Sequence, residues 1–447
     1  MSLEKRLQNV AVLGAGGKMG SGISLLLARE MTLEKLKPEN AKNTYELHLI
    51  DVNPDALDGL KQYLLKQAVK FVQKKPDLVR GVYQQAGRDL KDEALAEAFA
   101  KDMQSILRPT TDLTTAAAAT MVFEAIIENV DIKTNVLKQL GEACSSDTFF
   151  FSNTSSIPIH ILNEKSQLGG RIIGFHFYNP PAVQKLVEII VPQGVHPELP
   201  PLAEALGKRL GKILIPSNDI AGFIGNGHFM RDGLHGINEA LRLQKDFSFI
   251  EAVYMMNRVS QDFLIRPMGI FQLIDYVGLD VFQAILNIMN PHFPDENLHS
   301  ELIDDLVSRG IKGGQYSDGS QKNGFLKYEA GKIVGVFDVQ KNAYVTLAEG
   351  DWKQNADATL GPLPEGHLPW KAMLKAENRE EKLRNYFNHL KQMDTLGADL
   401  AKRYLKRSKE IGLQLVHQGV AQKAEDVNGV LMYGFYHLYG PINDFIE

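Results

Sequence analysis

Residues 10–24, VAVLGAGGKMGSGIS, decide the fold that we expect. The buried strand VAVL leads directly into a glycine turn, and a helical pattern follows. In a dinucleotide-binding turn, Gly14 would permit the tight bend, Gly16 the approach of a pyrophosphate, and Gly20 close packing of helix on strand. N–H groups at the helix start would hold the phosphates. The stretch predicts a dinucleotide site. Its spacing G-x-G-x-x-x-G is one residue longer than the commonest fingerprint, and a purely structural turn is the alternative.

The second strand-like run, YELHLIDV, ends in an acid, Asp51. A carboxylate in that place accepts hydrogen bonds from both ribose hydroxyls of NAD and repels the 2′-phosphate of NADP. We therefore expect NAD as the cofactor, with Asp51 in contact with its ribose. The alternative is an aspartate that only caps the helix expected from Pro54.

Short apolar runs alternate with helical patterns from residue 9 to about residue 217. This alternation predicts an α/β fold, a Rossmann-type doubly wound sheet with helices on both faces. After Ser217 the strand-like runs stop, and apolar spacings of three and four predict helices over 219–247 and 248–290. We expect an NAD-binding Rossmann domain over residues 1–217, followed by an all-α region.

The helical region is expected to contain two related copies. The segments DFLIRPMGIFQLID (262–275) and GFYHLYGPINDFIE (434–447) share an aromatic-rich helix end, a glycine and an apolar, acidic tail. The expected boundaries are 218–335 for the first copy, 336–370 for a linker that contains three prolines, and 371–447 for the second copy. A C-terminal domain unrelated to the first copy is the alternative.

The composition favours a globular protein without a nucleic-acid or membrane partner. Of 447 residues, 44% are apolar and 23% are charged, the formal net charge is -5, and no basic block stands out. The single cysteine, the lack of a signal-peptide pattern and the absence of a long apolar run predict a cytoplasmic protein. The histidines have no metal-like spacing, so we expect no metal site.

The segment GFHFYNPPAVQKLVEII (174–190) contains one histidine and one acid in two strand-like stretches. An Asn-Pro-Pro turn joins the stretches, and if they pair, Glu188 lies beside His176. A histidine suits the removal of a hydroxyl proton, and a carboxylate on its second ring nitrogen would fix the tautomer. A purely structural histidine at a strand end is the alternative.

The motifs FEAIIEN (123–129), SNTSS (152–156), GFHFYNPPAVQKLVEII and AGFIGNGH (221–228), in this order, resemble the L-3-hydroxyacyl-CoA dehydrogenase family of fatty-acid β-oxidation. The resemblance covers roughly residues 9–335. It implies that His176 is the catalytic base and Glu188 its partner. It also implies that Ser155 and Asn226 form hydrogen bonds with substrate oxygens.

The same resemblance implies further contacts with the cofactor. Glu128 and Asn179 match positions that line the nicotinamide pocket, and Lys133 matches a cofactor contact. Simpler roles are open for several of these residues. Glu128 would cap the following helix, Asn179 would only begin the proline turn, and Ser155 would cap a turn.

Residues 60–75 align with a helix that meets coenzyme A in the family. Lys66, Lys70 and Lys74 are therefore candidates for contact with its 3′-phosphate, and a solvated helix face is the alternative. In the family, the helical domain of a single-copy member dimerises, and in larger relatives a second copy takes the partner's place. The resemblance thus implies a monomer or weak oligomer that contains an internal pseudo-dimer.

The expected reaction is the reversible NAD-linked oxidation of a 3-hydroxyacyl-CoA to the 3-ketoacyl-CoA, with an acyl-CoA as the substrate. Two alternatives are open. One is a dehydrogenase of a free hydroxy acid, since the same base and cofactor serve both. The other is a catalytically silent NAD-binding scaffold that associates with other β-oxidation enzymes.

Overall fold

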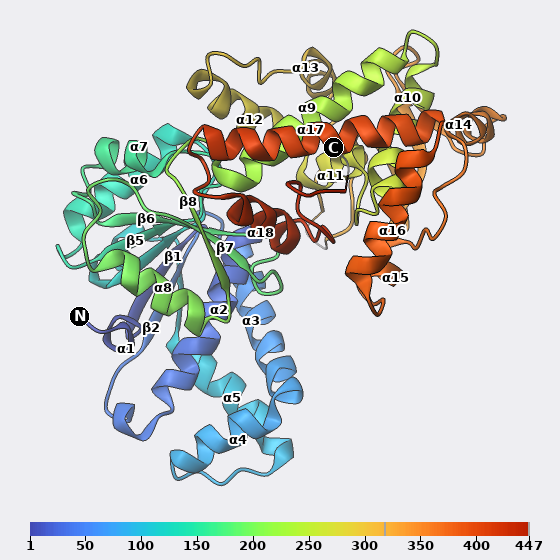
Figure 1. Cartoon of the computed structure of the whole chain (residues 1–447). Coiled ribbons are helices and arrows are strands. Elements are labelled where there is room, and N and C mark those ends of the chain that lie inside the picture. The colour runs from blue at the N-terminus through green and yellow to red at the C-terminus, as the bar shows by residue number, and fades with distance from the viewer. Residues whose placement is uncertain (317–318, 446–447) are drawn as a thin grey trace. The chain divides into compact units, whose positions relative to one another are not determined.

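The chain forms two compact units in a computed structural model (Figure 1). The first unit is Met1–Asp219 and the second is Ile220–Glu447, and the structure describes residues 1–316 and 319–445. The division falls two residues after the boundary expected from the sequence. Each unit has a hydrophobic core of its own residues.

The first unit is built on an eight-stranded sheet in the order β3-β2-β1-β4-β5-β6-β7-β8. Strands β2, β3, β4, β5 and β6 all run parallel to β1. Strand β7 is antiparallel to β6 and parallel to β8. The strands are β1 (Asn9–Leu13), β2 (Glu46–Ile50), β3 (Leu107–Thr110), β4 (Met121–Glu124), β5 (Phe149–Ser152), β6 (Ile172–Phe177), β7 (Leu186–Ile190) and β8 (Ile213–Ser217).

Helices cover this sheet, and the doubly wound fold is confirmed. They are α1 (Leu3–Arg6), α2 (Lys18–Lys35), α3 (Pro54–Lys74), α4 (Pro76–Gln85), α5 (Asp92–Ile106), α6 (Val130–Ala143), α7 (Ile159–Ser166) and α8 (Leu199–Arg209). The strand order reverses between β1 and β4, because β1 continues to β2 on one side while the chain resumes at β4 on the other. In open α/β sheets, ligands bind outside the carboxyl ends of the strands at such a switch point.

The edge strand β3 was not expected from the sequence. It is only four residues long, contains Pro109 and has one fully buried residue, Leu107. Proline cannot donate to a strand ladder and is tolerated at a sheet edge. The strand therefore shows no alternating apolar pattern and is recognisable only by its pairing with β2.

The second unit is mainly helical and also contains a three-stranded antiparallel sheet, in the order β11-β10-β9. Its helices are α9 (Phe223–Leu243), α10 (Phe249–Arg258), α11 (Ile270–Val277), α12 (Leu279–Met289), α13 (Glu301–Ser308), α14 (Trp352–Leu360), α15 (Trp370–Leu374), α16 (Arg379–Gln392), α17 (Leu396–His417) and α18 (Ala424–Gly434). Its strands are β9 (Leu326–Glu329), β10 (Lys332–Asp338) and β11 (Ala343–Thr346).

Two expectations for this unit are wrong. The region is not all-α, because β9, β10 and β11 form a sheet in it, and the helices expected over 248–290 are α10, a π-helical turn (Val259–Phe263, labelled η3), α11 and α12. Pro267 and the positive φ of Gly278 (110°) prevent one helix from running through. The segment 336–370 is also not a linker, because it contains the end of β10, all of β11 and α14, and it buries Val336, Phe337 and Leu360.

The two expected helical copies each contain an asparagine whose side-chain oxygen accepts a backbone N–H, 15 residues further on in the first and 14 in the second. In the first, the Asn257 Oδ1 accepts the N–H of Gln272 (3.0 Å) after α10. In the second, the Asn428 Oδ1 accepts the N–H of Ile442 (2.9 Å) after α18. A Cβ on Gly269 would lie 2.3 Å from the first asparagine oxygen, and one on Gly440 would lie 2.2 Å from the second. Each copy thus needs a glycine against its asparagine.

The backbone repeats the same correspondence. Ile265 and Tyr436 both have positive φ values, 48° and 57°, which are uncommon for residues other than glycine. Their separation equals that between Asn257 and Asn428. Helix α17 of the second copy packs along α9 of the first. These matches support an internal duplication of the helical domain.

A buried polar cluster joins the two copies. Arg266 forms an ion pair with Asp232 of α9 (2.8 Å), and both side chains are 6% exposed. From α17, the Tyr404 hydroxyl donates to Asp232 (3.1 Å), while the Ser408 hydroxyl accepts from Arg266 (3.2 Å). His228 lies 3.2 Å from the same serine. Removing one member of such a buried pair costs about 3–5 kcal/mol, because the other charge is left without its partner.

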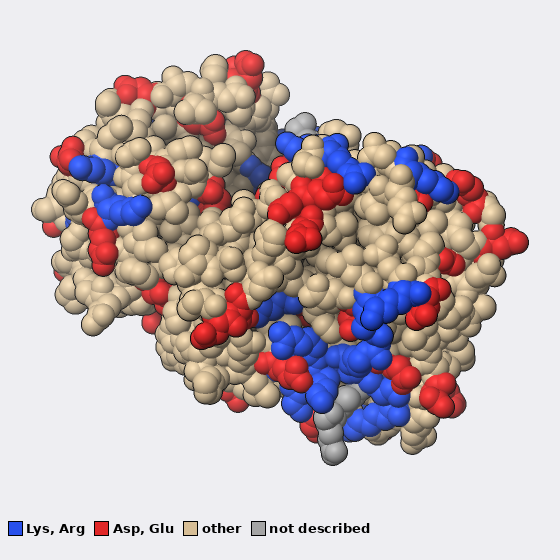
Figure 2. All heavy atoms as spheres, turned by 90° about the horizontal axis from the view of Figure 1, so that it is seen from above, with Lys and Arg blue, Asp and Glu red and all other residues tan. Residues whose placement is uncertain are grey.

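The exposed charges mix both signs. Figure 2 shows basic side chains interspersed with acidic ones over the visible face. On α17, for example, Arg403 pairs with Glu239 and Lys402 with Asp399. Exposed pairs of this kind contribute about 0–1 kcal/mol each, so buried contacts carry most of the stability.

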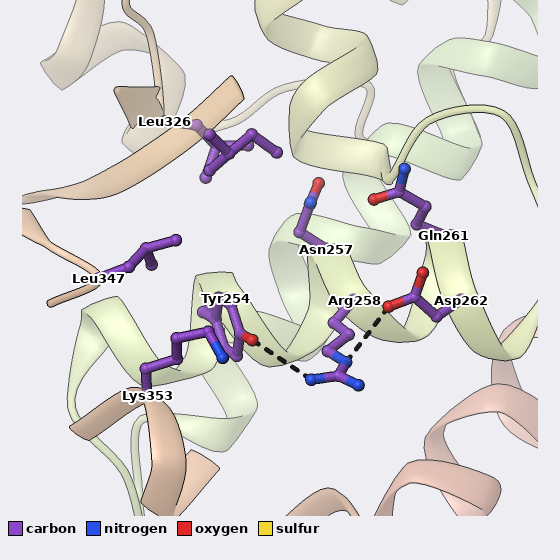
Figure 3. A pocket seen from close by; sticks show the side chains of 9 residues that line it. Tyr254, Asn257, Arg258, Gln261, Asp262, Leu326, Leu347 and Lys353 are labelled. Atoms are coloured by element: carbon purple, nitrogen blue, oxygen red, sulfur yellow. Dashed lines mark hydrogen bonds and ion pairs between the residues drawn. The ribbon is translucent and has the colours of Figure 1, made fainter. Parts of the chain in front are cut away.

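A cavity of about 200 Å³ lies between α10, η3 and the small sheet (Figure 3). Leu326, Ile333 and Leu347 form its apolar wall. The charged groups along the other wall pair with one another. Arg258 contacts Asp262 (3.2 Å), and Lys353 contacts Asp357 (2.7 Å). Asp357 also forms an ion pair with Arg258 and accepts the Tyr254 hydroxyl (2.8 Å), and these two contacts tie α10 to α14 beside the cavity.

The buried cluster predicts a stability that depends on pH. Burial lowers the pKa of His228 to about 4, whereas the pKa of an unfolded histidine is about 6.5. The folded state therefore favours the neutral ring. Its stabilising contribution is complete above about pH 6.5 and is lost as the pH falls toward 4, by up to about 3 kcal/mol. Calorimetric unfolding from pH 7.5 to 4.5 measures the loss.

The matched control is an exposed histidine of the same unit, His417. We expect His228→Gln to flatten the slope of stability against pH and His417→Gln to leave the slope unchanged. Equal slopes in all three proteins would contradict the assignment.

Candidate active site

The glycine turn brings the start of α2 close to the ends of two strands. Gly14 has a positive φ of 71°, and a Cβ there would lie 2.5 Å from the carbonyl oxygen of Ala125, after β4. A Cβ on Gly20 would lie 2.0 Å from the Gly14 oxygen. Helix α2 then begins after Gly17, which provides no side-chain cap. The start of α2 therefore has the form of an anion-binding helix N-terminus, without a capping side chain from Gly17.

Asp51 links the end of β2 to this turn. Its Oδ2 accepts the N–H of Gly16 (2.9 Å), and its Oδ1 accepts the N–H of Asn53 (3.0 Å). Asn53 is the residue that caps α3, through its contacts with the N–H groups of Asp55 and Ala56. The capping role considered for Asp51 thus belongs to Asn53.

These features fit a dinucleotide. A Cβ on Gly16 would lie 2.6 Å from the Ala56 side chain, so only glycine leaves the turn its present shape. Each oxygen of an ionised carboxylate has two lone pairs, so Asp51 retains acceptor capacity for ribose hydroxyls besides its backbone contacts.

His176 and Glu188 meet across the antiparallel pair β6–β7, where they are direct register partners. The His176 Nδ1 lies 3.2 Å from the Glu188 Oε1. Glu188 is fully buried and His176 is 7% exposed. When Nδ1 carries the hydrogen toward the carboxylate, Nε2 is the basic nitrogen of the neutral ring. The pair has the geometry of a base oriented by a carboxylate.

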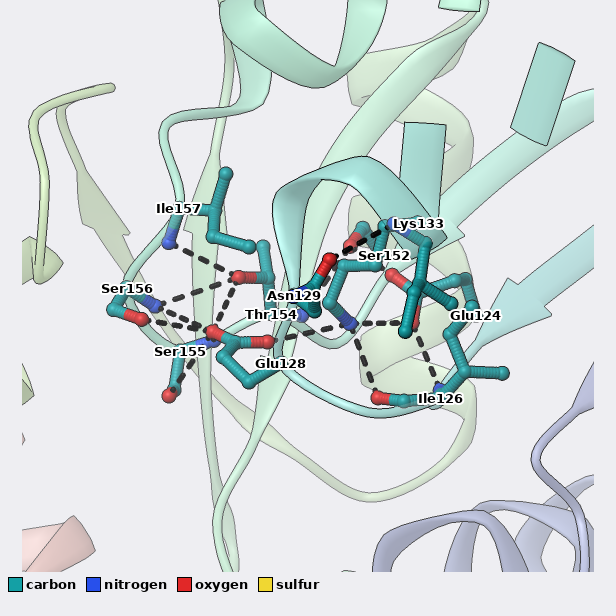
Figure 4. A network of polar contacts seen from close by, with 11 residues as sticks. Glu124, Ile126, Glu128, Asn129, Lys133, Ser152, Thr154, Ser155, Ser156 and Ile157 are labelled. Carbon is teal, nitrogen blue, oxygen red and sulfur yellow. Dashed lines mark hydrogen bonds and ion pairs between the residues drawn. The ribbon is translucent and has the colours of Figure 1, made fainter. Parts of the chain in front are cut away.

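A buried network supports the loop that follows β5 (Figure 4). Lys133 of α6 is 1% exposed, and its Nζ lies 2.5 Å from Glu124 and 3.2 Å from Glu128. The Ile126 carbonyl accepts from the same nitrogen (3.2 Å), and the Ser152 hydroxyl donates to Glu124 (2.6 Å). Burial alone would lower the pKa of Lys133, but the two carboxylates outweigh it and raise that pKa. Lys133 therefore remains charged.

Glu128 holds the SNTSS loop in place. It accepts the N–H of Ser155 (2.9 Å), the Thr154 hydroxyl (2.6 Å) and the Ser156 hydroxyl (2.8 Å). Burial opposes ionisation of Glu128, but Lys133 and these donors lower its pKa on balance. The cap of α6 is Asn129, so Glu128 has a role other than capping. A direct cofactor contact by Glu128 or Lys133 remains a prediction.

Sequence reasoning missed Lys212, which clamps the turn between β6 and β7. Its ammonium donates to the carbonyl oxygens of Pro181 (2.5 Å) and Gln184 (2.6 Å). Burial lowers the pKa of Lys212 to about 8, and Arg29 adds to this effect. Asn179, at the start of the same turn, is partly exposed. A lysine beyond the next helix gives no sequence signal for such a contact.

Three predicted substrate-binding residues, Lys66, Lys70 and Asn226, lie on α3 and α9. Lys66 and Lys70 are exposed and one helical turn apart on α3. Asn226 belongs to the second unit, where it lies in the first turns of α9 and is 9% exposed.

Within residues 1–316 and 319–445 there is no group of three or more His, Cys, Asp or Glu side chains arranged to hold a metal ion. No helix in the described part of the chain is long and apolar enough to cross a membrane.

The fold and the site define a dinucleotide-dependent dehydrogenase, and comparison with known proteins identifies the family. Residues 9–220 match the 3-hydroxyacyl-CoA dehydrogenase NAD-binding domain, and residues 234–327 match the C-terminal domain of the same family. The chain belongs to the 3-hydroxyacyl-CoA dehydrogenase family. It is an enzyme of this NAD-dependent class, and both the expected family and the expected cofactor are confirmed.

Individual relatives agree with this assignment. A probable 3-hydroxybutyryl-CoA dehydrogenase of Bacillus subtilis is 30% identical over 331 residues, which cover 72% of this chain and 98% of the relative. A probable 3-hydroxyacyl-CoA dehydrogenase of Caenorhabditis elegans is 29% identical over 320 residues, 70% of this chain and 95% of the relative. The crystal structure of 3-hydroxybutyryl-CoA dehydrogenase from Escherichia coli shares the fold at a TM-score of 0.64 and 22% identity, over 97% of this chain and 90% of that one.

The buried network makes a prediction about stability. Lys133→Met removes the ammonium from between Glu124 and Glu128 and leaves buried carboxylates without their counter-charge. We expect a loss of about 3–5 kcal/mol in the free energy of unfolding. Lys138→Met is the matched control, because Lys138 lies exposed on the same helix. Urea unfolding of both variants measures the difference, and equal stability would contradict the network's importance.

Proposed function

We propose that this enzyme catalyses the reversible NAD-linked oxidation of an L-3-hydroxyacyl-CoA to the 3-ketoacyl-CoA, as a step of fatty-acid β-oxidation. The observation that carries the proposal is the buried His176–Glu188 pair in a sheet whose first strand enters a glycine turn. Membership of the family supports the substrate class.

In the proposed reaction, the Nε2 of His176 takes the proton from the substrate hydroxyl. Glu188 accepts a hydrogen bond from Nδ1–H, which fixes the tautomer, and its charge stabilises the imidazolium that forms. Bound NAD supplies the acceptor for the hydride that leaves carbon 3 of the substrate. Burial of Glu188 strengthens this support, because an electrostatic interaction is weaker in water than in a protein interior.

Ser155 and Asn226 hold the substrate oxygens in this proposal. The backbone of Ser155 is anchored by Glu128, so its hydroxyl is presented from a fixed loop. Asp51, Gly14, Gly16 and Gly20 bind the adenosine and pyrophosphate portions of NAD. Glu128, Lys133 and Asn179 also contact the cofactor in this proposal.

Coenzyme A is proposed to meet the exposed face of α3. Lys66 and Lys70 present two ammonium groups there, which suits a phosphate. NADH consumption with acetoacetyl-CoA, longer 3-ketoacyl-CoAs and free acetoacetate tests the substrate class. Turnover of the free acid without turnover of any thioester would contradict the proposal.

We also propose that the second helical copy takes the place of a dimer partner. The buried cluster between α9 and α17 supports a chain that is stable as a monomer or weak oligomer. We expect the enzyme to work in the cytoplasm. Association with other β-oxidation enzymes is a further expectation.

Replacing the base tests the catalytic assignment. We expect His176→Ala to lower kcat by about 10²–10⁴-fold, the range for general acid–base catalysis, with nearly unchanged NADH affinity. Glu188→Gln should lower kcat as well, because the imidazolium loses its counter-charge. His196→Ala is the control, since His196 is an exposed histidine of the same unit. Stopped-flow turnover close to that of the unsubstituted enzyme in His176→Ala would rule the assignment out.

Replacing the ribose ligand tests the cofactor contact. We expect Asp51→Ala to weaken NAD binding and to reduce discrimination against NADP, because the carboxylate no longer binds hydroxyls or repels a 2′-phosphate. Asp55→Ala, at an exposed position in the first turn of α3, is the control. Fluorescence titration with NADH and NADPH measures both affinities. An unsubstituted enzyme that prefers NADPH would contradict this interpretation of Asp51.

A further inference from the structure

Glu188 serves a second hydrogen-bond donor besides His176. Its Oε1 lies 3.2 Å from the His176 Nδ1 and accepts the hydroxyl of Tyr178 at 2.6 Å. Tyr178 is 8% exposed, and its ring centroid lies 4.7 Å from that of the imidazole. The three side chains form one buried cluster around a single carboxylate oxygen.

The strand geometry explains this arrangement. Residues two apart in an extended chain project to the same face, so Tyr178 follows His176 on one side. Glu188 lies directly opposite His176, which makes it a diagonal neighbour of Tyr178, within reach of a long aromatic side chain.

The hydroxyl must be the donor in this contact. An ionised carboxylate only accepts hydrogen bonds, and 2.6 Å falls in the range of a charge-assisted O–H···O⁻ bond. Burial and the neighbouring Glu188 hold the pKa of Tyr178 well above its usual value, so the phenol keeps its proton. The Glu188 Oε1 thus interacts with the phenol as well as with the imidazole.

We propose that Tyr178 is a positioning residue that sets how strongly Glu188 acts on His176. This inference rests on the proposed role of His176 as the base. The hydrogen bond from the phenol stabilises the negative charge on the shared oxygen. Glu188 therefore stabilises the protonated imidazole less strongly. Tyr178 therefore lets His176 release its proton at a lower pH than a histidine–glutamate pair alone.

Charged groups on the neighbouring elements are engaged elsewhere. The residue of β8 beside Glu188 is Ile215, which carries no charge. Helices α7 and α8 pack against β6. On α7, His160 pairs with Asp219, and on α8, Arg209 pairs with two glutamates of α2. Lys212 is held by turn carbonyls. The phenol donates directly to Glu188, whereas the side chains of His160, Arg209 and Lys212 contact other groups.

Tyr178→Phe tests the proposal, because it removes the hydroxyl and keeps the ring. In the oxidation of a 3-hydroxyacyl-CoA, where His176 must be neutral, we expect the acidic limb of the pH profile of kcat/KM to move to higher pH by about 0.5–1 unit, as suits the loss of one hydrogen bond. NADH affinity should stay unchanged. Tyr83→Phe is the matched control, since the buried Tyr83 hydroxyl donates to another carboxylate of the same unit, Asp102 (2.7 Å). It should lower stability and leave the pH profile in place.

Identical pH profiles for the two variants would overturn the proposal. Replacement of Tyr178 by 3-fluorotyrosine supplies a second test, because it keeps the shape and makes the hydroxyl a stronger donor. The acidic limb should then move to lower pH, and an unmoved limb would again overturn the proposal. This variant decides the matter if Tyr178→Phe fails to bind NADH.

A readout without turnover separates this inference from the proposed function. In protein labelled with ¹³C-histidine, with His176→Asn to assign the signal, the His176 resonance should titrate at higher pH in Tyr178→Phe than in Tyr83→Phe. An unchanged midpoint overturns the role of Tyr178. Failure of the proposed function would appear instead as absence of acyl-CoA turnover in the unsubstituted enzyme, or as full turnover in His176→Ala.

Discussion

The antiparallel pairing of β6 with β7 is the constraint on which the candidate site depends. Strands β1 to β6 all run in one direction, and the chain then reverses through a proline turn instead of crossing over by a helix. Only a reversal of this kind puts Glu188 directly opposite His176, because a shift of register by one residue would turn the carboxylate to the other face. Lys212 fastens the turn that makes the reversal.

The cofactor side of the site is held by a different set of contacts. The doubly wound order brings the ends of β1 and β4 together, and the close approach of Gly14 to Ala125 is possible because no Cβ intervenes. From the end of β4, the buried pair of Lys133 and Glu124 leads to Glu128, which anchors the loop carrying Ser155. Backbone packing therefore shapes the dinucleotide turn, while buried charges shape the loop beside it.

The sequence predicted those features whose cause is local. The glycine turn, the Asp51 strand end and the pairing of His176 with Glu188 each follow from a short pattern. Features created by contacts distant in sequence were missed. Lys212 reaches the turn from beyond α8, and β3 is defined by its partner rather than by its own pattern. The helices expected over 248–290 follow from apolar spacing, and Pro267 lies where the chain breaks between η3 and α11.

The proposed duplication of the helical domain matches packing contacts but not polar side chains. The correspondence that matches Asn257 to Asn428 puts Gly397 at the place of Asn226. A Cβ there would lie 2.4 Å from the Phe263 ring and 2.7 Å from the Leu360 carbonyl, so the position is filled by close packing. The proposed second copy thus has the glycine–asparagine contact, while its counterpart of Asn226, Gly397, has no side chain.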